Sequence, residues 1–372
     1  MDKMRLLLSF LWKNRKSALF SFVGIFILTA VFSITLGAKV GYHKIYKSIG
    51  SKNILAVYEG NIACPYISLV PERYAPAILN IPHVIDIAGE VRQRYSYEND
   101  QNLTLLGIDP DKLLKFKDIE VSEAEFESFK TNINAALVGR KIYNCFNWKI
   151  GQVINTFGLT FKIAGVFDMP LSVYESMVIL HKDYLQQITA KRGYVTAFLI
   201  KTDLKEGDIK SLIQDIEAIF KDYPSRIVCR PEGEFWQAIK ASQGNLGDII
   251  FCIVLSVGIL LVILHINNAL FTFRQKIESI KMLKKLGFSR NSIACLVFCE
   301  TAAVSILSGI MAVIICYFAL IKHPYVGSDM FHPPIFINLQ VVIVVVLVSL
   351  FSGLLAALIT IPSALKEYDR YI

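Results

Sequence analysis

The stretch IIFCIVLSVGILLVILHINNALFTF, residues 249–273, decides the fold. It contains no Asp, Glu, Lys or Arg, and it exceeds the roughly 20 helical residues that cross the hydrocarbon core of a membrane. Three further runs lack these charges over a comparable length: 17–38, 301–321 and 337–361. A water-soluble helix carries a polar face, so these runs predict four transmembrane helices, the third over about 295–321.

The composition of the whole chain agrees with a membrane protein. Of the 372 residues, 54% are hydrophobic and 19% are charged, against about 25% charged in an ordinary soluble domain. These values exclude a disordered chain, a coiled coil and a small disulfide-stapled scaffold. The net charge of +8 fits either a nucleic-acid binder or a membrane protein with basic cytosolic loops, so its location has to decide.

The first uncharged run, 17–38, follows basic residues and could therefore be a cleaved signal peptide or a permanent anchor. The hydrophobic region of a signal peptide is usually about 7–15 residues long and ends at a small-residue cleavage site. This run is longer and continues into Lys39, which favours an uncleaved anchor.

The positions of the basic residues predict the topology. Five Lys or Arg precede the first run, six lie between 274 and 290, and two lie in the tail. Positive charge collects in short cytosolic segments, so we expect both termini in the cytosol and residues 39–247 outside. The excess positive charge then lies on the cytosolic side, where it forms a surface for anionic lipid or a protein partner. No nucleic-acid partner is expected.

Residues 39–247 are expected to form an α+β domain inserted between transmembrane helices 1 and 2. Short β-branched or alternating segments bounded by Gly, Pro or Asp predict strands, and a 3.6-residue period predicts helices. The expected strands are 54–58, 91–97, 103–108, 153–157, 161–166 and 197–201, and the expected helices are 71–79 and 209–220. A split βαβ unit with a β-rich insertion fits this order.

No enzyme motif is present in the sequence. It lacks the phosphate-binding loop, the G-x-S-x-G elbow and the H-E-x-x-H helix, so we expect no catalysis, no bound cofactor and no metal in this chain. His323 and His332 share one short loop and could ligate a metal or be solvated. Cys64, Cys145 and Cys229 permit at most one disulfide, or are simply buried thiols.

The segment RQKIESIKMLKKLGFS, residues 274–289, is too basic to enter the bilayer. Three-residue steps place Ile277, Ile280, Leu283 and Leu286 on one stripe of a short helix, expected over 275–287. Gly287 can end this helix in a left-handed conformation, and Ser289 can cap the next helix. Such a helix suits either docking to a soluble partner or anchoring to anionic lipid headgroups.

Small residues at four-residue spacing predict close packing in the last two transmembrane helices. They form either a dimer interface or a contact within the chain, and they are Ser305, Gly309, Ser349, Gly353 and Ala357. Residues 1–16 are expected to form an amphipathic helix on the inner membrane surface. The polar group His265, Asn267 and Asn268 serves either interhelical hydrogen bonding or substrate contact.

Several of these segments resemble a known family. Residues 283–289 (LKKLGFS), followed by Phe298, Glu300 and Gly309, are similar to the FtsX-like permease domain. Four other segments resemble parts of the MacB-like periplasmic core domain: 107–110 (GIDP), 138–140 (VGR), 149–152 (KIGQ) and 161–167 (FKIAGVF). The basic segment 11–17 and the ending 361–366 (IPSALK) also resemble these permeases. The family's acidic residue before the glycine is displaced by one position here, at Glu278.

The resemblance implies a fold with a MacB-like core domain over 39–247 and an FtsX-like permease domain over 248–372. It also implies a permease subunit, paired as a homodimer or heterodimer, that works with a separate ABC ATPase which binds the ATP. The residues implied in ATPase coupling are Lys276, Glu278, Ile280, Leu283, Lys284, Leu286 and Gly287.

Such permeases transmit ATP hydrolysis to their outer domain for export or extraction of a lipoprotein, lipid, peptide or drug-like substrate. They lie in the bacterial inner membrane among membrane lipids and can engage a periplasmic adaptor. The alternative from a different class is a membrane-anchored receptor or regulatory subunit without transport activity.

Overall fold

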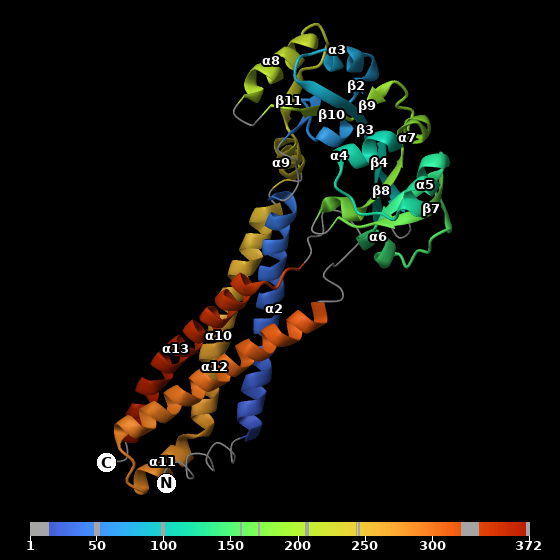
Figure 1. Ribbon diagram of the computed structural model, residues 1–372. Helices are drawn as coiled ribbons and strands as arrows, with labels where there is room; N and C mark the ends of the chain where they lie inside the picture. Colours follow the sequence, from blue (N-terminus) through green and yellow to red (C-terminus); the bar gives the residue numbers. More distant parts are fainter. Residues whose placement is uncertain are drawn as a thin grey trace. The chain divides into compact units, whose positions relative to one another are not determined.

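The computed structural model describes residues 15–47, 53–97, 101–156, 158–169, 172–204, 208–242, 244, 246–320 and 335–369 (Figure 1). The chain divides into two compact units near Gly41 and Gly247. One unit is a helix bundle and the other is an α/β domain, and each is described separately below. The expected amphipathic helix over 1–14 and the loop with His323 and His332 lie outside the described residues.

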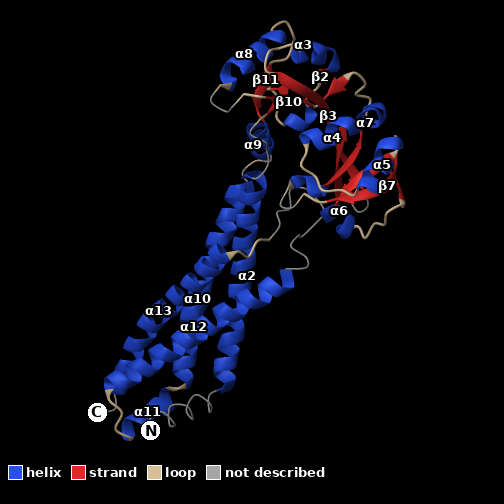
Figure 2. Ribbon diagram, viewed as in Figure 1, coloured by secondary structure: helices blue, strands red, loops and turns tan. Residues whose placement is uncertain are grey.

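In its described residues, the helix bundle consists of four long helices and one short one, drawn in blue in Figure 2. All four long helices contain a segment that is long and apolar enough to cross a membrane. They are α2 (Arg15–Lys47), α10 (Leu246–Gln275), α12 (Arg290–Leu320) and α13 (Leu339–Asp369). The short helix α11 (Ile277–Lys285) connects α10 to α12. The four predicted spans are therefore confirmed as helices.

All four long helices extend beyond their uncharged runs, and α2 and α13 have the longest C-terminal extensions. Helix α2 continues past residue 38 to Lys47, because a helix requires backbone hydrogen bonds rather than apolar side chains. Within this extension, Lys39 places its ammonium 4.2 Å from the ring centre of Phe251, a cation–π contact. Helix α13 continues through Pro362 to Asp369, although proline removes one backbone donor and usually bends a helix.

Packing within the bundle uses small apolar clusters rather than one large core. Phe32, Val254, Val313, Val341 and Val345 are buried together. Many large apolar side chains face outward instead, with exposed fractions of 64% for Leu19, 68% for Phe318 and 64% for Leu358. A helix that is apolar on all sides suits a lipid environment.

The α/β domain contains a nine-stranded mixed sheet in the order β11-β1-β10-β3-β4-β8-β5-β7-β6. Its strands are β1 (Ile54–Glu59), β3 (Val84–Tyr97), β4 (Gln101–Ile108), β5 (Ala135–Gly139), β6 (Val153–Thr156), β7 (Leu159–Phe167), β8 (Met177–His181), β10 (Ala197–Thr202) and β11 (Ile227–Pro231). A separate two-stranded sheet joins β2 (Val70–Pro71) and β9 (Tyr194–Val195).

The strand β3 connects two parts of the nine-stranded sheet. Its first half, up to Glu90, pairs with β10, and its second half, from Val91, pairs with β4. Strand β1 lies between β10 and β11 and is antiparallel to both. The segment β10–α8–β11 therefore forms a split βαβ unit around β1, and β4 to β8 form the inserted β-rich part.

The helices of this domain are short. They are α3 (Ala75–Leu79), α4 (Pro110–Phe116), α5 (Glu123–Thr131), α6 (Arg140–Cys145), α7 (Lys182–Ile188), α8 (Ile209–Ile219) and α9 (Glu232–Ser242), with 3-10 turns η1 (Pro65–Ile67), η2 (Glu72–Tyr74) and η4 (Val173–Ser176). The expected helix 209–220 is confirmed as α8. The expected helix 71–79 is divided into η2 and α3.

The expected strands are confirmed, and β3 begins earlier than expected, at Val84. The hairpin of β6 and β7 turns at Gly158, whose φ of +88° is the left-handed conformation that glycine adopts without strain. The segment 91–97 was expected as a half-buried strand, and the structure adds a buried charge to it. Arg92 is fully buried because charged and aromatic groups from other elements surround it.

Candidate functional site

The turn that joins α11 to α12 is fixed by backbone hydrogen bonds. The amide of Gly287 donates to the carbonyl of Lys284 at 2.9 Å, and the amide of Phe288 donates to Leu283 at 3.2 Å. With Gly287 at φ +82°, these two bonds form a Schellman motif. The Ser289 hydroxyl then accepts from the amide of Ser292 at 3.3 Å and caps α12. Both predicted caps are confirmed.

The apolar stripe of α11 divides between an inner and an outer face. Ile280 and Leu283 are each 4% exposed, and Ile280 packs with Phe273 and Ile293 of the flanking helices. Leu286 is 56% exposed. The sequence stripe therefore mixes residues that hold α11 against the bundle with one that faces outward.

A second exposed apolar residue was not predicted. Met282 is 57% exposed, and it lies four positions before Leu286, so both occupy one outward face of the helix end. Glu278 is exposed and Lys284 is half-buried, while Arg274, Lys285 and Arg290 are exposed. The outward face thus combines two large apolar side chains with mainly positive charge.

Lys276 differs from the other basic residues of this segment because its side chain is 5% exposed. Its ammonium forms an ion pair with the carboxylate of Glu300 on α12, whose side chain is 13% exposed. Lys276 also stands at the first position before α11. The pair therefore connects the start of α11 to α12, in addition to the covalent turn at the other end of the helix.

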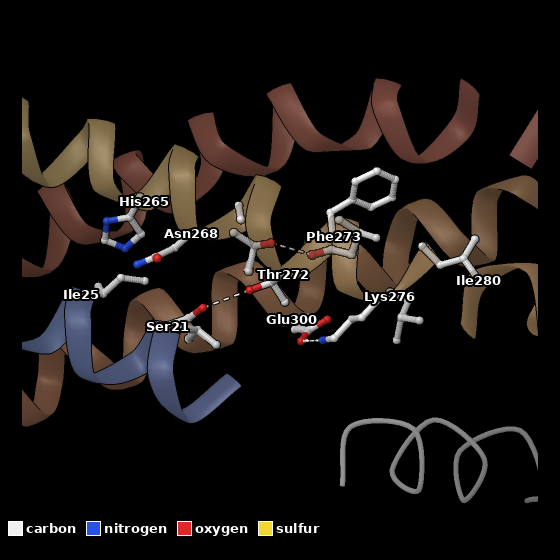
Figure 3. A pocket seen from close by; sticks show the side chains of 14 residues that line it. Ser21, Ile25, His265, Asn268, Thr272, Phe273, Lys276, Ile280 and Glu300 are labelled. Carbon is white, nitrogen blue, oxygen red and sulfur yellow. Dashed lines mark hydrogen bonds and ion pairs between the residues drawn. The ribbon is translucent and has the colours of Figure 1, made fainter. Parts of the chain in front are cut away.

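A small cavity lies beside this ion pair, between α2, α10, α11 and α12 (Figure 3). Its volume is about 50 Å³, which is room for a few water molecules but not for a drug-sized ligand. On its wall the hydroxyls of Ser21 and Thr272 lie 3.0 Å apart and join α2 to α10. Asn268 and Ile280 also line the cavity.

His265 lines the same cavity and is 1% exposed. Its Nδ1 lies 3.0 Å from the carbonyl of Leu261 and 3.2 Å from the hydroxyl of Ser352 on α13. Its Nε2 has no hydrogen-bond partner among the described residues. The predicted polar group thus includes a contact between α10 and α13.

The small residues of the last two helices lie at the contact of α12 with α13 within the chain. A Cβ added at Gly309 would lie 3.2 Å from Cβ of Ser349, and one added at Gly353 would lie 2.7 Å from Cβ of Ser305. Ser305 and Ser349 are fully buried, and Ala357 is 1% exposed. These positions allow the two backbones to approach closely.

The described residues contain no group of three His, Cys, Asp or Glu side chains that could hold a metal ion. In the sequence, Glu300 is the only charged residue between Arg290 and Lys322, and an acid within a span is a signal that a basic partner lies nearby. Lys276 is one of six basic residues between 274 and 290, so the sequence does not single it out as that partner.

Two family models match the chain. Residues 18–219 match the MacB-like periplasmic core domain, and residues 249–368 match the FtsX-like permease C-terminal domain. No curated protein sequence matches the chain.

Among solved structures, the α/β part is similar to two extracytoplasmic domains. One is the extracellular domain of the noncanonic ABC-type transporter YknZ from Gram-positive bacteria, at 14% identity and a TM-score of 0.38, covering 48% of this chain and 99% of that one. The other is the periplasmic region of MacB from Actinobacillus actinomycetemcomitans, at 10% identity and a TM-score of 0.39, covering 51% and 94%. The family assignment rests on the two family models, which together span most of the chain: the protein belongs to the MacB/FtsX-type family of ABC transporter permease subunits.

Proposed function

We propose that this permease couples ATP hydrolysis by a separate ABC ATPase to movement of its own α/β domain, and so exports or extracts a substrate. The ATPase chain binds the ATP and docks on the outward face of α11. The observation that carries the proposal is the pair of exposed apolar side chains, Met282 and Leu286, on a short helix fixed between two membrane-spanning helices.

The chemistry of this face supports a protein partner. Exposed apolar side chains ringed by polar groups are typical of binding surfaces. Here the ring includes the exposed cations Lys285 and Arg290. A partner surface with an apolar recess and carboxylates would complement this face, whereas a lipid headgroup layer would need only the charge.

The internal contacts of α11 support transmission of force. Ile280 and Leu283 pack into the bundle, Lys276 pairs with Glu300, and the Schellman turn fixes the other end. A push on α11 would therefore displace α10 and α12 together, because α11 cannot move independently of them without breaking buried contacts. Helix α10 continues in sequence from α9 of the α/β domain.

The remaining parts of the proposal follow the family and the charge distribution. The helices lie in a bacterial inner membrane, with both termini and α11 in the cytosol, because the basic residues concentrate in those segments. Two permease chains, as a homodimer or heterodimer, work with the ATPase among membrane lipids. The substrate is a lipoprotein, lipid, peptide or drug-like molecule, and a periplasmic adaptor engages the α/β domain.

The test is copurification of the tagged chain with an ABC ATPase from its own host. Leu286→Asp places a carboxylate on the proposed docking face, and we expect it to abolish ATPase association. The matched control is Ile67→Asp, which changes an apolar residue of similar exposure, 62%, in the α/β domain and should leave association intact. Retention of the ATPase by Leu286→Asp at wild-type stoichiometry and turnover would refute the proposal and favour a receptor or regulatory subunit.

A further inference from the structure

Among the charged side chains buried in the described part of the α/β domain, four contact one another. Glu90 and Arg92 come from β3, Lys117 follows α4, and Glu232 is the first residue of α9. Glu90 and Arg92 are fully buried, and Lys117 and Glu232 are 4% and 3% exposed. Burial of even one unpaired charge is costly, so these four groups, called the buried ion network here, have to be explained together.

The four charges form one continuous chain of contacts. Arg92 Nη2 lies 2.5 Å and Nε 3.1 Å from Oε2 of Glu90. Lys117 Nζ lies 3.0 Å from Oε1 of Glu90, an ion-pair contact without hydrogen-bond geometry, and donates to Oε1 of Glu232 at 2.8 Å. Two acids and two bases thus alternate, and their charges sum to zero.

Tyr174 of η4 completes the network. Its hydroxyl accepts from Lys117 at 2.5 Å and lies 3.5 Å from Oε1 of Glu232. Burial raises the pKa of Tyr174 to about 12, so this hydroxyl stays protonated at neutral pH. It therefore supplies hydrogen bonding without adding charge.

The charged forms of Glu90 and Lys117 are favoured in the folded domain. Burial alone would raise the pKa of Glu90, but Arg92 and Lys117 outweigh this effect and hold that pKa below its usual value. Burial would lower the pKa of Lys117, but Glu232 and Glu90 raise it above its usual value. Each charge is stable only while its partners stay in place.

Aromatic residues of α9 add a second set of contacts on the same arginine. The guanidinium carbon of Arg92 lies 4.6 Å from the ring centre of Trp236 and 4.8 Å from that of Phe235. Both rings are fully buried. Helix α9 is thus connected to β3 in two ways: through Glu232, by way of Lys117, and through these rings one turn later.

This attachment differs physically from ordinary apolar packing. In an apolar interface, the cost of sliding is spread over many weak contacts of about 0.1–0.2 kcal/mol each. Here a shift of α9 by one residue, about 1.5 Å, would withdraw Glu232 from Lys117 and leave two buried charges less compensated. Breaking a buried ion pair on one side is strongly unfavourable, so the attachment has one discrete register.

The location of the network gives this property a role. Glu90 stands where β3 passes from its pairing with β10 to its pairing with β4. Helix α9 is followed in sequence by α10 after only residues 243–245. The network therefore attaches the last helix before a membrane span to the strand shared by both parts of the sheet.

We propose that the buried ion network fixes α9 to β3 in one register, so that displacement of α10 moves both parts of the sheet without being absorbed by sliding of α9. The role in transmission rests on the function proposed above, whereas the fixed register is a property of this chain alone.

The test uses the full chain in lipid nanodiscs and amide hydrogen exchange. Glu232→Gln removes one charge of the network. The matched control is Glu234→Gln, on the same helix, with a side chain 62% exposed and 4.0 Å from Arg230. We expect amides of α9 to exchange at least 10-fold faster in Glu232→Gln than in Glu234→Gln. Equal rates in the two variants would overturn the fixed register.

A second variant separates transmission from folding. Lys117→Met with Glu232→Met removes one acid and one base together, leaving the Glu90–Arg92 pair, and apolar replacement of a buried ion pair is often neutral for stability. In complex with the ATPase, we expect ATP to change the exchange of β3 amides in the wild type and in Glu234→Gln. In the double variant, the ATP-dependent change in the exchange of β3 amides should be at least fivefold smaller. The ATP-dependent change in the exchange of α11 amides should persist.

The outcomes distinguish the two proposals. If ATP changes the exchange of β3 amides equally in the double variant and in the wild type, the network has no role in transmission. The proposed coupling function would remain valid in that case. A wild-type chain that binds no ATPase would refute the proposed function instead, and the exchange rates of α9 in the free chain would still decide the register.

Discussion

Replacement of Gly353 by alanine should destabilise the helix bundle, because this glycine faces Ser305 across the contact of α12 with α13. The added Cβ would lie 2.7 Å from Cβ of Ser305, about 0.7 Å closer than the 3.4 Å at which ordinary contact begins. Gly353 and Ser305 are both buried, so α12 and α13 have to separate locally to make room for the added Cβ. Overpacking of this kind costs about 1–3 kcal/mol.

The helix propensity of alanine offsets part of this cost. Alanine is more favourable than glycine inside a helix by about 1 kcal/mol. The net destabilisation expected for Gly353→Ala is therefore about 1 kcal/mol, with about 2 kcal/mol as the upper end. Gly309→Ala is the matched control, because its Cβ would lie 3.2 Å from Cβ of Ser349 and requires a smaller shift. We expect that variant to be neutral or slightly stabilised.

The measurement is the free energy of unfolding of the full chain in mixed micelles, titrated with a denaturing detergent. Ser305→Gly removes the opposing atoms, so in the Gly353→Ala background it should recover about 1 kcal/mol more than it does in the wild type, a coupling expected for residues in contact. The reasoning fails if Gly353→Ala is as stable as Gly309→Ala, or if Ser305→Gly gives the same change in both backgrounds.

Three further predictions concern the basic segment and the α/β domain. Gly287→Ala forces a residue with a Cβ into φ +82°. We expect the free energy of unfolding to fall by about 1–2 kcal/mol and the amides of α11 to exchange faster. Unchanged amide exchange in α11 would contradict this prediction. Lys276→Met leaves the Glu300 carboxylate without its ion-pair partner. We expect this single variant to lower the melting temperature more than the double variant Lys276→Met with Glu300→Met does. Equal decreases in the single and double variants would contradict this prediction. The Arg140 guanidinium, bonded to Asp168 at 2.9 and 2.6 Å, lowers the pKa of that carboxyl. The stabilisation by the Arg140–Asp168 ion pair is therefore present above the unfolded pKa of Asp168, about 3.9, and is lost as the pH falls through its lower folded pKa. We expect the melting temperature to fall less between pH 5 and pH 2 in Arg140→Gln than in the wild type. An equal fall in the two proteins would refute this prediction.

The transmembrane part of the fold could be predicted from the sequence because hydrophobicity over 20 residues is a local property. The ends of the helices could not be predicted equally well. Lys39 and Lys44 interrupt the apolar run, but they do not interrupt backbone hydrogen bonding, so α2 continues to Lys47. The expected fourth span ended at 361, just before Pro362, yet the one donor missing at this proline did not stop the helix, and α13 continues to Asp369.

The caps of the α11 segment were predictable for a similar reason, since Gly287 and Ser289 act on their near neighbours. The long-range partners were not. Lys276 and Glu300 are 24 residues apart, and their pairing depends on how α11 turns between two helices. The stripe through Ile280 and Leu283 was visible in the sequence, but whether it faces the bundle or a partner depends on the tertiary packing.

The buried ion network was hidden from sequence reasoning for a different reason. Arg92 stands at a position of β3 where alternation predicts a solvent-facing polar residue. Its burial depends on Trp236 and Phe235, more than 140 residues later in the chain. A charged residue on a strand indicates solvent by default, because burial of charge requires partners that only the folded chain brings together.

The pairing of β1 with β11 determines how the α/β domain bears mechanical load. Leu55, near the start of β1, pairs with Pro231, the last residue of β11, so the strands that follow α2 and precede α9 meet at one end of the sheet. Antiparallel neighbours pulled apart at a shared end open like a zipper, one pair at a time, which needs less force than shearing all pairs at once. If the two connections move together, the domain is carried as a rigid body. If they separate, unfolding begins at Leu55 and Pro231 and proceeds along β1; under the proposed function, this would limit the stroke that the domain could transmit.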